Sequence, residues 1–129
     1  MPGRYLFDTS VLIGLLRGDV QIRQKLDEGG EFYTSVVVLG ELYFGVRRSE
    51  QGERNRQRLD AMVSSLAVLP IERLTAEVYS RLKGELRDSG QPIPDNDLWV
   101  AATAHQHGLT LVERDRHFEA LRGVPRERW

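Results

Sequence analysis

Cysteine is absent from this chain of 129 residues. Disulfide bonds, thiolate catalysis and zinc sites with cysteine ligands are therefore excluded, which leaves oxygen and imidazole groups as metal ligands. Long apolar runs are also absent, because none approaches the roughly 20 residues that cross a bilayer. The N-terminal residues do not form a basic segment followed by a long apolar one, so we expect no signal peptide. These absences predict a cytoplasmic protein that does not associate with a membrane.

Lysine is scarce, with only Lys25 and Lys83 among the 18 lysine and arginine residues, and the net charge is −1. This balance excludes a highly basic nucleic-acid scaffold, although it allows a local basic patch. Hydrophobic residues make up 40% of the chain, an ordinary fraction for a globular protein. We therefore expect residues 1–129 to form a single domain with one core.

The stretch over residues 4–16 combines a strand, an acid and a helix. Residues 5–7 are apolar, which is typical of a strand buried on both faces. Asp8 follows, and then come Thr9 and Ser10, residue types that cap the helix predicted for residues 11–16. Ligands of open α/β sheets bind outside the carboxyl ends of the strands, where Asp8 would lie. The simpler alternative is that Asp8 only favours the start of the helix through its charge.

Strands and helices alternate along the rest of the chain, which predicts a parallel sheet covered on both faces. We expect further strands at residues 32–34, 67–69 and 109–112, and a brief edge strand near Val124. A helix is expected through residues 59–66, and a short helical turn near Phe118. The other helices are expected to begin at capping residues, namely Asp19, Ser35, Thr75 and Asp95.

Four carboxylates are expected to converge at one edge of this sheet. Asp8 and Asp115 follow apolar strands, and Asp97 lies in the first turn of a helix whose alanines allow close packing on the sheet. Glu41 shares an otherwise apolar helix face, where a charge needs a partner or a cation. Such a cluster attracts Mg²⁺ or Mn²⁺, which prefer oxygen ligands. A metal held in this way serves the hydrolysis of a phosphodiester.

Several of these acids have simpler alternatives. Asp97 alone would compensate a helix dipole, and Glu41 alone would be a surface glutamate. Asp95 is interpreted as an N-cap rather than a ligand. Spacing by itself therefore leaves the four-acid site open.

A family resemblance favours the site. The motifs that carry it are LFDTSVLI at 6–13, GELYFG at 40–45, IPDNDLWVAATA at 93–104 and LVERDRHF at 111–118. In these motifs and their order, over nearly its whole length, the chain resembles the PIN-domain ribonucleases of the VapC toxin type. The third acid of the family precedes a hydrophobic-Ala-Ala segment, so it corresponds to Asp97 rather than Asp95.

The resemblance implies a PIN-like three-layer α/β/α sandwich with a five-stranded parallel sheet. It also implies Mg²⁺-dependent or Mn²⁺-dependent endonucleolytic cleavage of RNA by a toxin, which a cognate VapB-like antitoxin inhibits, and a homodimer. The catalytic and metal-binding residues would be Asp8, Glu41, Asp97 and Asp115. Thr9 would hydrogen-bond a carboxylate or a water on the metal.

Glu113 departs from the resemblance, because similar proteins often have a small hydroxyl residue at this position. An extra acid there would alter the number of metal ions or the contacts around them, or it would pair with Arg114 or Arg116. Its role therefore stays open.

The histidines and aromatics near the motifs have simpler roles. His105, His107 and His117 are expected on the surface or in packing contacts, because nothing in the four-acid pattern requires them. Trp99 and Phe118 are interpreted as core or rim aromatics, with base stacking as the alternative.

RNA is expected to reach the site along a basic rim that includes Arg114 and Arg116. A weaker candidate patch, equally well explained as a solvated charged face, consists of Arg47, Arg48, Arg54, Arg56 and Arg58.

The helix at 36–48 is apolar on more than one face, which leaves Tyr43 or Phe44 in water unless something covers them. Neighbouring helices of the same chain would bury these side chains in the simpler interpretation. The resemblance favours a dimer and a groove for an apolar antitoxin segment. An inserted antitoxin arginine would then compete with the metal.

Two other classes of protein were compared with this interpretation. A phospho-signalling receiver domain needs an acid pair at the first strand and a lysine after a late strand, and the chain has neither. A catalytically inactive PIN module that only binds RNA or protein would lack one or more of the four acids, and all four are present.

Overall fold

The computed structural model describes residues 3–129 and is built around one sheet of five parallel strands. The strand order is β3-β2-β1-β4-β5, so β1 pairs with β2 on one side and with β4 on the other. This arrangement confirms the predicted α/β fold. The strands are β1 (Arg4–Phe7), β2 (Glu31–Ser35), β3 (Ala67–Leu69), β4 (Thr110–Glu113) and β5 (Arg126–Arg128).

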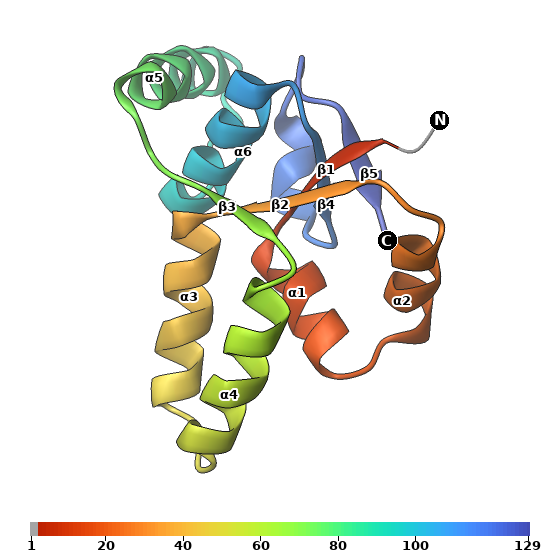
Figure 1. The fold of residues 1–129 in the computed structure, drawn as a ribbon. Coiled ribbons are helices and arrows are strands. Elements are labelled where there is room, and N and C mark those ends of the chain that lie inside the picture. Colours follow the sequence, from red (N-terminus) through yellow and green to blue (C-terminus); the bar gives the residue numbers. More distant parts are fainter. Residues whose placement is uncertain (1–2) are drawn as a thin grey trace.

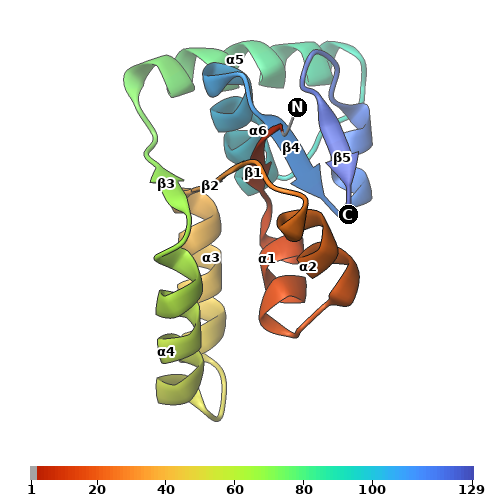
Figure 2. The same ribbon diagram turned by 45° about the vertical axis from the view of Figure 1, so that its right-hand side comes forward.

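Helices cover both faces of the sheet. α5 and α6 lie on one side and α1 and α2 on the other, while α3 and α4 project side by side beyond the sheet (Figures 1 and 2). No helix within residues 3–129 is long and apolar enough to span a membrane. The helices are α1 (Thr9–Leu16), α2 (Val20–Asp27), α3 (Val36–Arg47), α4 (Gly52–Val63), α5 (Arg73–Asp88) and α6 (Asp95–His107), and a 3-10 turn, η1, spans Arg116–Ala120.

The core explains why the two central strands are almost entirely apolar. Leu6 and Phe7 of β1 and Leu111 and Val112 of β4 are fully buried, because helices pack on both faces of these strands. The small side chains of α6 that face the sheet are fully buried too. Close packing of α6 therefore brings its first turn, with Asp97, toward the carboxyl ends of β1 and β4.

Two of the predicted caps are confirmed. Asp19 Oδ1 accepts a hydrogen bond from the amide of Ile22 at 3.1 Å, and Ser35 Oγ accepts one from the amide of Val38 at 3.2 Å. Each bond satisfies a backbone donor that has no partner within its own helix. These caps fix where α2 and α3 begin, and thereby set the position of Glu41 in the second turn of α3.

The other predicted caps are wrong by one or a few residues. α1 begins at Thr9 with Asp8 in the N-cap position, so Thr9 and Ser10 lie inside the helix. Glu72 is the N-cap of α5, and Thr75 Oγ1 instead accepts a hydrogen bond from the Glu72 amide at 2.9 Å. Pro94, not Asp95, occupies the N-cap of α6.

Three expected element ends also move. α4 ends at Val63, before Leu66, and β4 begins at Thr110 rather than Leu109. Val124 is buried in the core, and the edge strand β5 starts two residues later. Leu109 and Val124 are therefore apolar because they are buried just before β4 and β5, not because they belong to these strands.

Candidate metal centre

Asp8 is a buried acid at the end of the central strand. Its amide donates a hydrogen bond to the carbonyl of Val112 at 3.0 Å, which continues the β1–β4 pairing by one residue. The side chain is only 4% exposed. It makes no capping hydrogen bond to α1, although it occupies the N-cap position. Asp8 therefore lies at the start of α1, as the helix-start alternative expects, but its side chain does not cap the helix.

Glu41 and Thr9 contribute polar atoms without partners. Glu41 Oε1 and Thr9 Oγ1 are both buried, and within residues 3–129 neither forms a hydrogen bond of normal geometry. A buried oxygen without a partner costs free energy, so native structures normally satisfy such atoms with water or an ion. The Thr9 hydroxyl does lie beside Glu41 and lowers the pKa of that carboxyl, although the contact lacks the geometry of a normal hydrogen bond. Both oxygens fit a site for a cation and its waters.

Asp97, Asp115 and His117 form a second part of the site. Asp97 lies in the first turn of α6, and Asp115 is the N-cap of η1, where its Oδ1 accepts a hydrogen bond from the His117 amide at 3.0 Å. His117 Nδ1 lies 2.9 Å from Asp97 Oδ2 and 3.2 Å from Asp115 Oδ1. One ligand atom from each residue falls within 4.8 Å of the others, a spacing that could hold a metal ion.

The pKa values show electrostatic repulsion among the four acids. Burial raises the pKa of Asp8 from its ordinary 3.8 to about 7, the Thr9 amide opposes this, and the charges of Asp97, Glu41 and Asp115 raise it further. Burial also raises the pKa of Glu41 and of Asp97. Carboxylates that repel one another in a poorly solvated site favour a cation among them. The charges of the other three acids thus act on Asp8, whereas the ligand atoms that lie within 4.8 Å of one another are those of Asp97, Asp115 and His117. A metal site made of all four acids stays a prediction.

Glu113 faces a different partner. Its carboxylate is buried, and Oε1 lies 3.8 Å from Nη1 of Arg126 on the neighbouring strand β5. Burial raises the pKa of Glu113, and the charges of Arg126 and Arg128 lower it. The pairing with Arg114 or Arg116 considered from the sequence is not the one found, because β5 supplies the closer arginine.

Arg114 is held by contacts within the protein. Its Nη2 lies 2.9 Å from Asp19 Oδ2, and its Nε donates to the Trp129 carbonyl at 2.6 Å. The guanidinium also lies beside Gly14, where an added Cβ would come within 3.3 Å of Nη1. Arg116, in contrast, is exposed. Of the two arginines expected on the RNA rim, Arg116 is thus the one free to meet a phosphate.

Asp95 is engaged away from the other acids. It accepts a hydrogen bond from the Tyr79 hydroxyl at 2.8 Å and forms an ion pair with Lys83 at 3.2 Å. Both contacts lower the pKa of Asp95. The interpretation that Asp95 is not a ligand agrees with this geometry, although its predicted role as a cap does not.

His105, Trp99 and Phe118 pack as expected, whereas His107 Nε2 is buried without a hydrogen-bond partner within residues 3–129 and His117 is an exception. His105 contacts Arg81 and the carbonyl of Gly123. Phe118 is fully buried, and Trp99 stacks on Tyr79 with ring centroids 3.9 Å apart. His117 is the exception, because it contacts two of the acids. Its position two residues after Asp115, at the start of a tight turn, was the available signal in the sequence.

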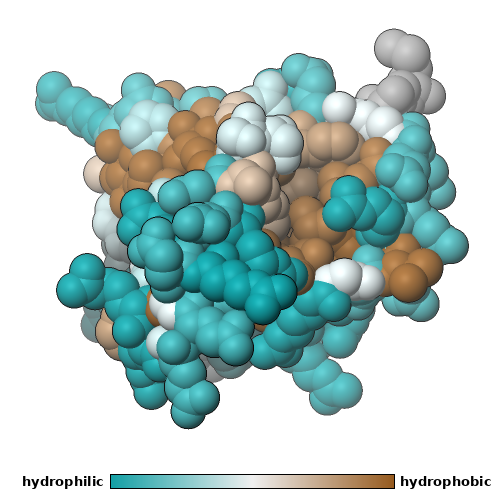
Figure 3. Space-filling model, turned by 60° about the horizontal axis from the view of Figure 1, so that its bottom comes forward, coloured by the Kyte–Doolittle hydropathy of each residue, from teal (hydrophilic) through white to brown (hydrophobic). Residues whose placement is uncertain are grey.

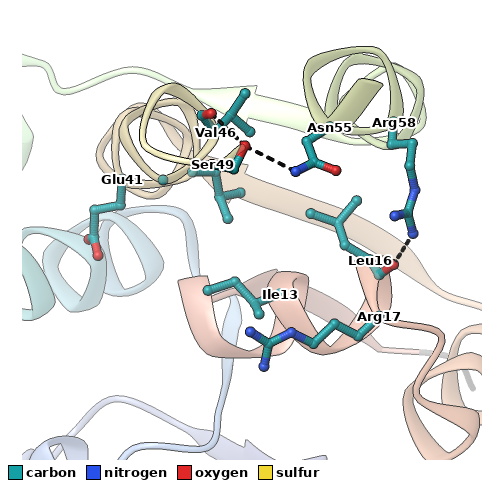
Figure 4. Close-up of a pocket in the computed structure, with 10 residues that line it drawn as sticks. Ile13, Leu16, Arg17, Glu41, Val46, Ser49, Asn55 and Arg58 are labelled. Carbon is teal, nitrogen blue, oxygen red and sulfur yellow. Dashed lines mark hydrogen bonds between the residues drawn. The ribbon is translucent and has the colours of Figure 1, made fainter. Parts of the chain in front are cut away.

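An apolar groove opens beside the acids. It has a volume of about 280 Å³ and runs between α1, α3 and α4, with Glu41 and Arg58 at opposite sides (Figure 4). Arg58 donates to the Leu16 carbonyl at the end of α1, and Ser49 Oγ accepts from Asn55 Nδ2 at 3.0 Å. Figure 3 shows hydrophilic residues over the projecting helices and a recessed apolar surface beside them. The groove therefore reaches one of the four acids, Glu41.

Comparison with known proteins agrees with this geometry. The sequence pattern of the PIN domain matches residues 5–124. Ribonuclease VapC2 of Haemophilus influenzae is 31% identical over 98% of this chain and 98% of that protein. Ribonuclease VapC5 of Mycobacterium tuberculosis is 34% identical over 95% and 91%. The crystal structure of DNA-bound VapBC from Salmonella typhimurium matches with a TM-score of 0.93 at 27% identity, over 100% of this chain and 99% of that one.

Proposed function

The chain belongs to the PIN-domain family and is a ribonuclease of the VapC type, and we propose that it is a toxin that hydrolyses RNA phosphodiester bonds endonucleolytically with Mg²⁺ or Mn²⁺. The observation that carries this proposal is the cluster of Asp8, Glu41, Asp97 and Asp115 at one edge of the sheet. The cluster includes a buried carboxyl, that of Asp8, whose pKa is raised to about 7.

Each side chain of the cluster has a part in the proposal. Asp8, Glu41, Asp97 and Asp115 would hold the cation, and the Thr9 hydroxyl beside Glu41 would orient a carboxylate or a water. A divalent cation bound there would polarise the substrate phosphate and lower the pKa of a water. The burial of Asp8 excludes bulk water from the inner side of the site, which strengthens every charge interaction there. A module that only binds RNA or protein would not need four converging acids.

The site predicts where Mn²⁺ will be found. Crystals soaked in Mn²⁺ should show anomalous density in contact with at least two of the four acids, because ligand atoms of Asp97 and Asp115 lie within 4.8 Å of each other and their charges act on Asp8. The measurement is an anomalous difference map collected at the manganese edge. Density confined to Asp95 or to other surface acids would contradict the proposal, as would an Mn²⁺ site that none of the four acids touches.

We expect Arg116→Ala to weaken RNA binding and to lower the salt slope of log Kd by about one, because each phosphate contact releases about one counterion. Arg114→Ala is the matched comparison. Since Arg114 pairs with Asp19 and Trp129, its loss should instead lower the free energy of unfolding by about 1–2 kcal/mol. Fluorescence anisotropy with a labelled RNA at several salt concentrations, together with urea denaturation, separates the two effects. Unchanged affinity and slope in Arg116→Ala would show that the rim lies elsewhere.

A VapB-like antitoxin is the proposed partner, since the similar Salmonella structure is that of DNA-bound VapBC. An apolar antitoxin segment fits the groove between α1, α3 and α4, and an arginine on it would reach the acids and compete with the cation. The purified pair should therefore cleave RNA much more slowly than the toxin alone, and added Mg²⁺ should restore part of the activity. A tight complex with full ribonuclease activity would contradict this form of inhibition.

A homodimer is the second proposed assembly. Phe44 remains 60% exposed, although Tyr43 packs against α4 and hydrogen-bonds Asp60 at 3.3 Å. The chain itself therefore covers Tyr43 but leaves Phe44 exposed, and the expectation of an interface depended on these two aromatic residues. A single exposed phenylalanine is not a contiguous apolar patch, so the proposal of a homodimer rests on the resemblance to the VapC family.

A further inference from the structure

We propose that His117 is a nitrogen ligand of the cation and that it gives the site a preference for Mn²⁺ over Mg²⁺. This inference rests on the proposed metal-dependent function, but it adds a ligand that the four-acid pattern does not contain. It starts from the one side chain that touches two of the acids at once, through Nδ1.

The spacing of the donor atoms fits an octahedral ion. Two ligands at right angles around Mg²⁺ or Mn²⁺, each about 2.1 Å from the ion, lie about 3.0 Å apart. His117 Nδ1 lies 2.9 Å from Asp97 Oδ2 and 3.2 Å from Asp115 Oδ1. Both distances match neighbouring corners of one coordination sphere, so a cation could bind all three atoms with little rearrangement.

The backbone holds the imidazole in this position. The His117 amide donates to Asp115 Oδ1 at 3.0 Å, and the next residue, Phe118, is fully buried. These two anchors fix the turn on either side of the histidine. Its side chain is 53% exposed, whereas that of Asp97 is 16% exposed. His117 therefore lies on the solvent side of Asp97.

The rest of the site argues for a cation rather than for a simple ion pair. Among the ion-pair contacts formed by residues 3–129, only those of His117 involve Asp97 or Asp115. One imidazole does not neutralise four acids, and Glu41 Oε1 and Thr9 Oγ1 still lack partners. An additional positive charge is needed, and Nδ1 lies where such a charge would bind.

Ligand chemistry then decides the preference between metals. Both ions prefer oxygen ligands, but Mn²⁺, as a first-row transition-metal ion, accepts an imidazole nitrogen more readily than Mg²⁺ does. A site with one imidazole among oxygen ligands thus gains more from binding Mn²⁺ than from binding Mg²⁺. Loss of the imidazole should remove that difference and leave the oxygen ligands in place.

The test is pulsed electron paramagnetic resonance of the full chain without a histidine tag, loaded with Mn²⁺. The wild-type protein should show nuclear modulation from a directly coordinated nitrogen. His117→Ala and His117→Gln should lose it, while the control His105→Ala should keep it, because His105 contacts Arg81 and Gly123 instead. Since the His117 side chain is half-exposed, both variants should retain the wild-type circular dichroism spectrum.

Calorimetric titration gives the second readout. His117→Ala should bind Mn²⁺ at least about tenfold more weakly, with a change in Mg²⁺ affinity of less than about threefold. Mn²⁺ bound without a nitrogen signal would overturn the proposal and leave the four-acid site intact, and His117 would then be a hydrogen-bond partner of the acids. An equal loss of affinity for both ions would also overturn it. If neither ion binds the wild-type protein, the proposed function fails as well.

Discussion

Replacing Asp8 with asparagine should reduce RNA cleavage by at least about a hundredfold and yet leave the metal-free protein no less stable. The loss of activity follows because asparagine removes one negative charge from the innermost position of the proposed cation site. The gain in stability follows because the carboxylate that is removed is 96% buried and faces three other acids. Asparagine has nearly the same shape and carries no charge.

The size of the stability effect is bounded by the pKa of Asp8. Raising this pKa from 3.8 to about 7 corresponds to a penalty of up to about 4 kcal/mol for the ionised form at pH 8. Asparagine avoids the penalty, but it introduces an amide that needs partners in a buried position. We therefore expect a gain of about 1–3 kcal/mol in the free energy of unfolding, measured in EDTA.

The matched control is Asp88→Asn, an exposed acid at the end of α5. It should leave cleavage unchanged and alter stability by less than about 0.5 kcal/mol. Initial rates on a defined RNA with saturating Mg²⁺, together with urea denaturation in EDTA, complete the comparison. Cleavage at the wild-type rate in Asp8→Asn would show that Asp8 is not part of the catalytic site.

The metal-free protein should lose stability as the pH rises from about 4 to above 7. A carboxyl whose pKa is higher in the folded chain than in the unfolded chain holds its proton more tightly when folded. The stabilisation from Asp8 is therefore fully present below about pH 4 and is lost as the pH rises through about 7. The raised pKa values of Glu41 and Asp97 act in the same direction.

Mg²⁺ should cancel this loss of stability at higher pH, because the cation binds the ionised acids of the folded chain. We expect the free energy of unfolding in EDTA to fall by about 2–4 kcal/mol between pH 5 and pH 8. In 10 mM Mg²⁺, a concentration chosen to be roughly saturating, the fall should largely disappear. Asp8→Asn in EDTA should show a flatter profile than the wild type. Stability that increases with pH in EDTA would contradict the assignment of a raised pKa to Asp8.

The sequence by itself determined the order of strands and helices, and together with the family resemblance it predicted the four acids. Asp8 and Asp115 follow buried strands, and a position just after a parallel strand lies at the same sheet edge wherever the strand is placed. Ser35 fixes the start of α3 through its cap, so the helical repeat alone places Glu41 in that helix. Such features depend on residues close in the chain, and local patterns predict them well.

The tertiary structure decided which partner each polar side chain near the acids takes. His117 reaches Asp97, 20 residues away, and Arg114 reaches Asp19 and Trp129 from opposite ends of the chain. Glu113 turns to Arg126 because β5 packs beside β4. These pairings depend on how distant segments pack, and hydrophobic periodicity contains no information about them. The local sequence therefore placed the acids, while the packing of distant segments selected the groups that surround them.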